Sequence, residues 1–312
     1  MEGKILIIGA GGQIGSELTV KLRSIYGQDQ VIASDINYNN VALVNSGFFE
    51  ILDAQDFKAL KVCCEKHNIK TIYLMAAMLS ATGEKYPNKA WDLNTESLLH
   101  VLNLAKSKLI DKIFWPSSIA VFGPSTPKEN TPQYTIMEPT TVYGITKQVG
   151  ERWCEYYHQK YGVDVRSIRY PGIISWKTLP GGGTTDYAVE IYHEALKNNT
   201  YECFLSEETN LPMLFMDDAI KATVDIMQAK PEDIKIRSSY NLAGISFTPQ
   251  EIAASVKKQL PGFTITYKPD FRQAIANSWP GSINDTEARQ HWNWKHSFDL
   301  DAITKEMLDN LK

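Results

Sequence analysis

The chain has 312 residues, of which 43% are hydrophobic and 22% charged, and its formal net charge is −4 at pH 7. This composition is typical of a globular protein with a large core, and the absence of a basic run argues against nucleic acid as a partner. No apolar run reaches the roughly 18 residues of a membrane span, so we expect no membrane partner. A strand is predicted from Lys4, which leaves no room for a targeting segment, and we expect a cytoplasmic protein.

The four cysteines carry no metal-binding spacing. Cys63 and Cys64 are adjacent, and Cys154 and Cys203 stand alone. Reduced thiols fit the cytoplasm. The histidines form no ligand cluster in the sequence either, so we expect no metal.

Apolar runs alternate with helical patterns through the first half of the chain. The expected strands are residues 4–10, 30–36, 71–77, 112–123 and 164–174. The expected helices between them are residues 13–27, 56–68, 90–107 and 141–162. Strands that alternate with helices of this length form βαβ units with parallel strands, so the predicted fold is α/β with a doubly wound parallel sheet.

The alternation weakens after about Ser175, where Pro, Gly and Thr become dense. We therefore predict a first domain of residues 1–175 and a smaller lobe of residues 176–312. Within that lobe, the segment of about 212–245 is expected to pack back on the first domain.

The first strand leads into a glycine motif at a strand-to-helix turn. Gly9, Gly12 and Gly15 form G-x-x-G-x-x-G, and Gln13 and Ile14 begin the following helix. Small residues let backbone N–H groups and the helix N-terminus approach a pyrophosphate. This predicts a dinucleotide site of the Rossmann type in residues 1–175.

An aspartate at the end of the second strand indicates which dinucleotide binds. Asp35 follows Gly15 by 20 residues, the place where a carboxylate bonds the adenosine ribose hydroxyls. A carboxylate repels a 2′-phosphate and no arginine follows it, so the predicted cofactor is NAD. Asp53, after the apolar run at 48–52, is either a contact of the adenine amine or a turn residue at the end of a strand.

Tyr143 and Lys147 lie four residues apart in a predicted helix, on one face and one turn from each other. This pair suits proton abstraction from an alcohol. Tyrosine titrates near ~10, and we expect the Lys147 ammonium and the positive nicotinamide ring to lower its pKa. Ser117 and Ser118 end a predicted strand, where they would face the ligand crevice of an α/β sheet. The alternative is that Tyr143 and Lys147 are a pair of surface residues with no catalytic role.

The glycine motif, Asp35, the Ser–Tyr–Lys set and "RYPG" at 169–172 together resemble the extended short-chain dehydrogenase/reductase family. The resemblance covers essentially the whole chain. The resemblance implies that Ser118, Tyr143 and Lys147 are catalytic and that Asn94 organises the site, unless Asn94 is a polar residue on a solvated face. Phe122 departs from the family, which commonly has tyrosine there. The further cofactor contacts that it implies are Leu74, Ala76, Ala77, Pro171 and Ile173.

The stretch "PGGGTTDYA" at 180–188 closely follows the strand expected to contact the nicotinamide. Glycine backbone N–H groups there can approach an anion, and Thr184 and Thr185 add hydroxyl donors, so the loop suits a small carboxylate. The alternative is a crossover loop with a helix cap, since Thr and Asp cap helices well.

Three stretches are similar to the threonine 3-dehydrogenase branch of the family: "GGGTTDYAVEIY", "WPSSIAVFGP" and "FRQAIANSWPGSINDTEAR". This similarity implies NAD-dependent oxidation of the 3-hydroxyl of L-threonine to 2-amino-3-oxobutanoate in threonine catabolism, with Tyr143 as general base. The implied substrate contacts are Ser80, Ser118, Tyr143, Gly183, Thr184, Thr185 and Trp279. Trp279 alternatively packs inside the lobe. Two other functions stay open: a sugar-nucleotide epimerase or dehydratase, and a non-catalytic NAD-binding regulatory protein.

Two predicted helices, residues 93–107 and 141–161, carry apolar side chains on more than one face. Examples are Leu98, Leu99, Leu102, Trp153, Tyr156 and Tyr157. In this family such helices pair in a four-helix bundle, so we expect a homodimer. Burial within one subunit is the alternative.

Overall fold

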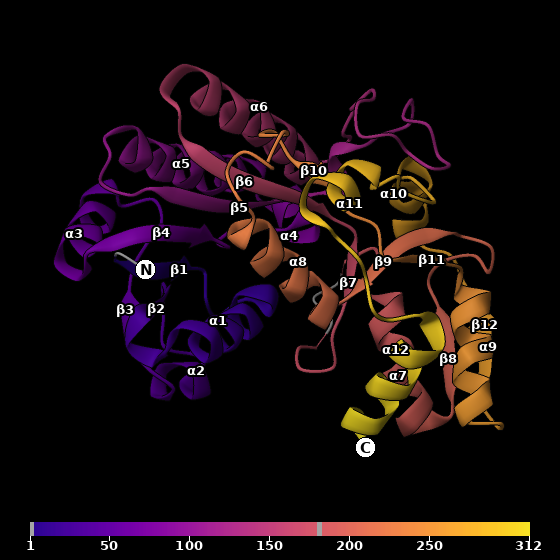
Figure 1. Cartoon of the computed structure of the whole chain (residues 1–312). Coiled ribbons are helices and arrows are strands. Elements are labelled where there is room, and N and C mark those ends of the chain that lie inside the picture. The colour runs from indigo at the N-terminus through magenta and orange to yellow at the C-terminus, as the bar shows by residue number, and fades with distance from the viewer. Residues whose placement is uncertain (1–2, 180–182) are drawn as a thin grey trace. The chain divides into compact units, whose positions relative to one another are not determined.

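The computed structural model describes residues 3–179 and 183–312 and has the predicted α/β fold (Figure 1). The chain divides into two compact units. The first consists of Met1–Ser118, Thr141–Arg169 and Ile220–Tyr240, and the second of Ile119–Thr140, Tyr170–Ala219 and Asn241–Lys312. The division of the chain at residue 175 stays a prediction.

The main sheet contains seven strands in the described residues. In order across the sheet they are β10 (Tyr240–Asn241), β6 (Asp164–Tyr170), β5 (Lys112–Ser118), β4 (Ile69–Leu74), β1 (Lys4–Ile8), β2 (Val31–Asp35) and β3 (Phe49–Ile51). The pairings from β3 through β2, β1 and β4 to β5 are all parallel. The order 3-2-1-4-5-6 is that of a dinucleotide-binding Rossmann sheet, and the predicted doubly wound fold is confirmed.

Helices pack on the strands of this sheet. They are α1 (Gln13–Tyr26), α3 (Phe57–His67), α5 (Pro87–Lys106), α6 (Val142–Tyr161) and α8 (Met216–Gln228). Buried side chains of α3, α5 and α6 share one apolar cluster with the strands, including Leu60, Leu98, Leu102 and Cys154. In the view of Figure 1, α5 and α6 lie on one side of the strands and α1 on the other.

The other elements of the first half are short: the 3₁₀ turns η1 (Gln28–Gln30) and η2 (Ile119–Val121), and the helices α2 (Val41–Asn45) and α4 (Ser80–Lys85). The second unit has the strands β7 (Gly172–Ile174), β8 (Thr200–Cys203), β9 (Leu211–Phe215), β11 (Ile245–Phe247) and β12 (Thr264–Tyr267). Its helices are α7 (Tyr187–Asn198), α9 (Pro249–Gln259), α10 (Arg272–Ser278), α11 (Thr286–Trp292) and α12 (Leu300–Leu311).

Two predicted strands have different bounds in the structure. The strand predicted to reach residue 123 ends at Ser118, because η2 follows at once. The strand predicted over 164–174 is two strands, β6 and β7, which belong to different sheets. Pro171 separates them, and proline lacks the N–H that a continuous ladder requires.

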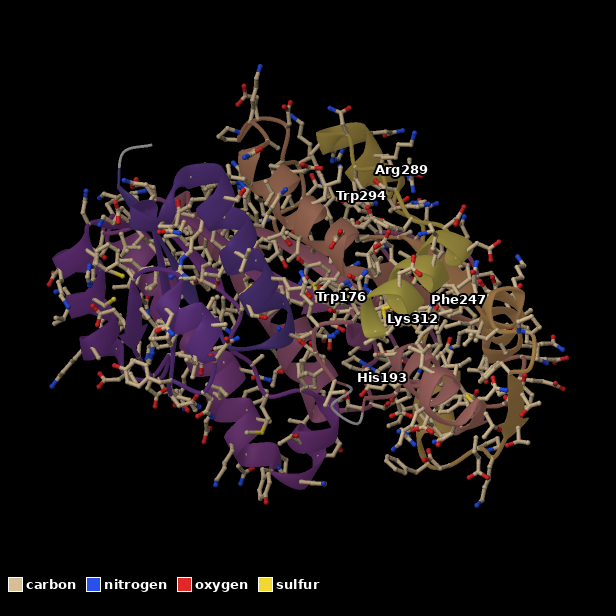
Figure 2. All side chains as sticks on the ribbon, turned by 90° about the horizontal axis from the view of Figure 1, so that it is seen from below. Trp176, His193, Phe247, Arg289, Trp294 and Lys312 are labelled. Carbon is tan, nitrogen blue, oxygen red and sulfur yellow. The ribbon has the colours of Figure 1, made fainter. Side chains whose placement is uncertain are left out.

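Buried aromatic side chains form the interior of the second unit. Trp294, labelled in Figure 2, is 2% exposed, and its indole Nε1–H donates to Asp285 (2.9 Å) and to the Ala243 carbonyl (3.1 Å). Phe247, also labelled, packs edge to face with Tyr187. The two hydrogen bonds of Trp294 satisfy the polar edge of its indole inside an apolar core.

Over the described residues, no helix is both long and apolar enough to cross a membrane.

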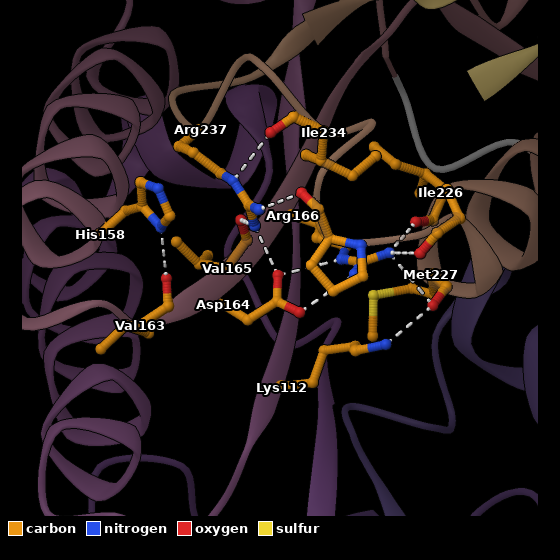
Figure 3. Close-up of polar contacts among 12 residues, drawn as sticks. Lys112, His158, Val163, Asp164, Val165, Arg166, Ile226, Met227, Ile234 and Arg237 are labelled. Atoms are coloured by element: carbon orange, nitrogen blue, oxygen red, sulfur yellow. Dashed lines mark hydrogen bonds and ion pairs between the residues drawn. The ribbon is translucent and has the colours of Figure 1, made fainter. Parts of the chain in front are cut away.

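A charged cluster fixes β6 to the C-terminus of α8 in the first unit (Figure 3). Arg166, fully buried, donates to the carbonyl oxygens of Ile226, Met227 and Ala229 and pairs with Asp164 (3.0 Å). Arg237 pairs with the same Asp164 carboxylate. Burial by itself would raise the pKa of Asp164, but Arg166 and Arg237 together hold it below its ordinary value.

Candidate active site

The glycine turn between β1 and α1 is built for close backbone contact. Gly9 has φ +82°, and a Cβ there would lie 2.5 Å from the Ala76 nitrogen. A Cβ on Gly15 would lie 2.3 Å from the Gly9 carbonyl oxygen, whereas one on Gly12 would meet only that oxygen at 3.4 Å. Gly9 therefore permits the turn, Gly15 lets α1 pack on it, and Gly12 leaves space for a ligand. Among the described residues, no side chain caps the first turn of α1, so its N–H groups can receive an anion.

Asp35 lies at the end of β2, directly beside the glycine turn. Its carboxylate accepts hydrogen bonds from the Gly11 N–H and the Ile36 N–H, each at 2.8 Å. The side chain is partly exposed. These two bonds fix the Asp35 carboxylate at the carboxyl end of β2, beside the glycine turn. Asp53 follows β3 and accepts the Gln55 N–H at 2.9 Å, as a turn residue does.

Asn94 connects the segment after β4 to α6. Its amide accepts the Met78 N–H (2.8 Å) and donates to the Met78 carbonyl (3.1 Å) and to the Thr146 hydroxyl (3.1 Å). It is 5% exposed, so it is not a residue on a solvated face. The same segment contains Ala76 and Ala77, which are half-buried, after the buried Leu74 at the end of β4.

Ser118, Tyr143 and Lys147 lie together in the first unit. Ser118 ends β5 and shares a side-chain hydrogen bond with Tyr143 at the start of α6. The Lys147 Nζ donates to the Pro116 carbonyl at 2.6 Å and lies 5.5 Å from the centroid of the Tyr143 ring. The predicted helix around 141–162 thus places the pair on one face against the predicted strand end.

Burial dominates the titration of this set. It raises the pKa of the Tyr143 phenol to about 12, and the Ser118 hydrogen bond lowers it only in part. Burial also lowers the pKa of the Lys147 ammonium to about 7, against the opposite effects of Cys154 and Glu151. The expectation that the Lys147 ammonium and the nicotinamide ring together lower the Tyr143 pKa concerns the complex with the cofactor and stays a prediction, whereas in the chain by itself the removal of the phenol from water raises that pKa.

Residues 183–188 of the glycine-rich stretch belong to the second unit, and Pro180, Gly181 and Gly182 lie outside the described residues. Gly183 donates its N–H to the Asp186 carboxylate at 2.7 Å, so this N–H is already bonded. Thr184 is 4% exposed, and Thr185 is half-buried with its side chain against Gly172. Asp186 thus organises the loop before α7 through Gly183.

The other predicted contacts occupy separate places. Ser80 is the first residue of α4 and is half-buried. Pro171 and Ile173 lie at β7 in the second unit, the first buried and the second half-buried. Trp279 follows α10 and is 9% exposed, which agrees with the alternative of packing inside the lobe.

Two acidic residues near α6 were not predicted. Glu84 accepts the Val142 N–H (2.8 Å) at the start of α6. Glu151 accepts a hydrogen bond from Ser117 (2.7 Å). Glu151 follows Lys147 by four residues and so shares its helix face, and this spacing could have drawn attention to it. Nothing in the sequence marks Glu84.

Among the described residues, no group of three or more His, Cys, Asp or Glu side chains could hold a metal ion.

The strand order, the glycine turn and Asp35 define the chain as a dinucleotide-binding Rossmann protein. The profile of the NAD dependent epimerase/dehydratase family matches residues 5–243. The chain belongs to this family, and the predicted cofactor, NAD, is confirmed with it. The absence of a side chain at Gly12 and the uncapped first turn of α1 fit a pyrophosphate, and Asp35 fits a ribose without a 2′-phosphate.

Relatives are similar along the whole chain. An uncharacterized epimerase/dehydratase of Staphylococcus haemolyticus is 47% identical over 307 residues, covering 98% of this chain and 96% of the relative. The solved structure of a GalE-like L-threonine dehydrogenase from Cupriavidus necator in its holo form is 55% identical with TM-score 0.96, covering 99% and 100%. A monomeric L-threonine 3-dehydrogenase of metagenomic origin, in its apo form, is 47% identical with TM-score 0.93, covering 98% of each chain.

Proposed function

We propose that this protein is an NAD-dependent L-threonine 3-dehydrogenase. The observation that carries the proposal is the Ser118–Tyr143–Lys147 set at the end of β5 and the start of α6. Likeness to solved L-threonine dehydrogenases along nearly the whole chain supports the choice of substrate. The reaction removes a proton from the 3-hydroxyl and a hydride from C3, which gives 2-amino-3-oxobutanoate.

The chain's own residues would handle the proton. Tyr143 accepts it from the 3-hydroxyl, and Ser118 donates a hydrogen bond to the substrate oxygen beside it. Lys147 has three N–H donors, so its bond to Pro116 leaves others for the nicotinamide ribose. Bound NAD would supply the acceptor for the hydride. Burial raises the phenol pKa to about 12 in the chain by itself, and a positive charge beside Tyr143 would lower it.

The substrate carboxylate is assigned to the loop that precedes α7. Thr184 and Thr185 supply hydroxyl donors there, and Ser80 and Trp279 are further proposed contacts. Since the Gly183 N–H is bonded to Asp186, we assign the role of anion donor to the threonine hydroxyls rather than to this backbone group.

We also propose a homodimer formed through α5 and α6. Leu98 and Leu102 pack within the chain and are buried, so they cannot form an exposed face. Trp153 and Tyr156 are 37% and 41% exposed, with ring centroids 5.7 Å apart. These two aromatic residues are the part of the predicted interface that remains available. One related enzyme is described as monomeric.

Light scattering at micromolar concentration tests the assembly. We expect twice the 35.2 kDa of one chain, and the mass of one chain after Trp153→Glu, because a charge would be buried at the interface. A monomeric wild type contradicts the dimer.

The protein is further proposed to act in the cytoplasm, where its four buried, free cysteines stay reduced.

The activity itself is tested by mixing the purified protein with NAD and L-threonine and following NADH absorbance. We expect NADH to accumulate with threonine and not with UDP-sugars. A sugar-nucleotide epimerase would interconvert UDP-sugars with no net NADH. A protein that binds NAD and turns over neither substrate would be a regulatory protein, and both outcomes contradict the proposal.

A further inference from the structure

Three consecutive residues at the end of β5 bond to one face of α6. The Pro116 carbonyl accepts from Lys147 at 2.6 Å, and Ser117 Oγ donates to Glu151 Oε1 at 2.7 Å. The third residue, Ser118, shares its hydrogen bond with the phenol of Tyr143. The three helix residues are spaced by four, so they lie on one face in successive turns.

The helix lies very close to the strand along this line. A Cβ on Gly150 would come 2.4 Å from the ring of Trp115, so only glycine fits there. The Lys147 ammonium lies 4.6 Å from the centroid of the same ring. With this close approach, a small slide of α6 along β5 would break the hydrogen bonds at the strand end.

Glu151 is anchored independently of β5. Arg169 on β6 donates Nε–H to Oε1 (2.8 Å) and Nη2–H to Oε2 (2.7 Å) of the carboxylate. Glu151 is fully buried and Arg169 is 3% exposed. A bidentate pair fixes both side chains in orientation, and neither can leave without an unpaired charge in the interior. The acceptor for Ser117 is therefore held by the neighbouring strand of the sheet.

We propose that Glu151, held by Arg169, is a positioning residue of this site: through Ser117 it fixes the end of β5 so that the Ser118 hydroxyl meets the Tyr143 phenol. Glu151 itself touches no reacting atom. Its connection to the reaction rests on the proposed function, whereas its effect on the Ser118–Tyr143 contact does not. A purely structural ion pair would support the fold without affecting that contact.

The variant Ser117→Ala removes the link and leaves the Glu151–Arg169 pair intact. Ser97→Ala is the matched control, since Ser97 is a buried serine on α5 that donates to the Leu93 carbonyl at 2.6 Å and lies outside the site. Ser117→Thr restores a hydroxyl. The direct readout is the ζ-carbon NMR resonance of Tyr143 in protein with ¹³C-labelled tyrosine, assigned by its loss in Tyr143→Phe.

We expect the Tyr143 resonance to shift in Ser117→Ala, to stay in place in Ser97→Ala and to return toward its wild-type position in Ser117→Thr. We also expect kcat for threonine to fall at least about tenfold in Ser117→Ala, because small displacements of reacting groups are costly, while the Kd for NAD stays within about twofold.

An unmoved Tyr143 resonance in Ser117→Ala overturns the positioning role, whatever the activity. Equal losses of kcat in Ser117→Ala and Ser97→Ala, in step with lost stability, also overturn it. If the resonance shifts as expected but wild type makes no NADH from threonine, the proposed function fails and the positioning role stands.

Discussion

The side-chain amide of Asn94 binds both backbone groups of Met78. It accepts the Met78 N–H at 2.8 Å and donates to the Met78 carbonyl at 3.1 Å, and its second donor contact is Thr146 on α6. The segment after β4, which contains Ala76 and Ala77, is thereby fixed to the helix that carries Tyr143 and Lys147.

Replacement of Asn94 by alanine should loosen this segment. The loss leaves two backbone groups of Met78 without partners, at a cost of roughly 1–3 kcal/mol. We expect weaker NAD binding and a lower melting temperature, measured by titration calorimetry and thermal unfolding. Asn103→Ala is the control. Asn103 lies on α5, as Asn94 does, and its replacement removes one hydrogen bond from the Tyr157 hydroxyl. Equal NAD affinity in both variants would rule out the role of Asn94.

Tyr143→Phe removes the ionisable oxygen and keeps the ring. General acid–base groups commonly contribute about 10²–10⁴-fold, so kcat should fall by that order while NAD still binds. In wild type the base must be deprotonated, and the pKa of Tyr143 is raised to about 12 in the chain alone. The rate should therefore increase with pH above neutrality and level off above the pKa that Tyr143 has in the complex with NAD. A variant with near wild-type turnover would show that another group is the base.

Asp35→Ser should weaken NAD binding and narrow the preference for NAD over NADP. The substitution removes the proposed partner of the ribose hydroxyls and the charge that repels a 2′-phosphate. Losing a hydrogen bond to a charged group costs roughly 1.5–3 kcal/mol, or about 10- to 100-fold in Kd. Steady-state kinetics with both cofactors measures the change, with the exposed Asp29→Ser as control. Unchanged selectivity would mean that Asp35 does not contact the cofactor.

Thr185→Ala tests the carboxylate site of the substrate. We expect kcat/KM for L-threonine to fall by about 10- to 100-fold, for loss of one bond to a charged group, with the Kd for NAD nearly unchanged. 1-Amino-2-propanol lacks the carboxylate, so it should be a poor substrate and lose much less from the substitution. Loss of NAD affinity and of thermal stability with normal threonine kinetics would instead make the loop a structural cap.

Asp164→Asn tests the charged cluster between β6 and α8. It leaves the buried Arg166 and Arg237 without their carboxylate, which should lower the free energy of unfolding by about 3–5 kcal/mol. The Asp164 pKa is lower in the folded chain than the roughly 3.9 of an unfolded one. The stabilisation is therefore present above about pH 4 and is lost as the pH falls through the folded value.

Denaturant unfolding of wild type and Asp164→Asn across this pH range measures the effect. The difference between the two proteins should shrink in acid. Asp309→Asn, which breaks an exposed pair with Lys305, should leave the stability nearly unchanged. An equally small loss in Asp164→Asn would show that the carbonyl contacts of Arg166 are sufficient by themselves.

The local pattern of the sequence by itself determined the dinucleotide end of the fold. Gly9, Gly12 and Gly15 predict a turn whose geometry follows from backbone sterics, and Asp35 ends a strand that must lie beside it in a parallel sheet. Tyr143 and Lys147 share a helix face because of a spacing of four. These features depend on neighbours in the chain or on strand order, which apolar periodicity reveals.

Only the tertiary structure decided the surroundings of these residues. Three features depend on contacts between elements distant in sequence. Lys147 donates to Pro116, and Arg169 on β6 holds Glu151 on α6. The chain also passes from one sheet to another at Pro171, between β6 and β7. The pKa of Tyr143 in the chain by itself depends on the same kind of contact, since burial raises it. Spacing places an ammonium nearby, whereas the loss of water around the phenol arises only when the strand and helix pack together.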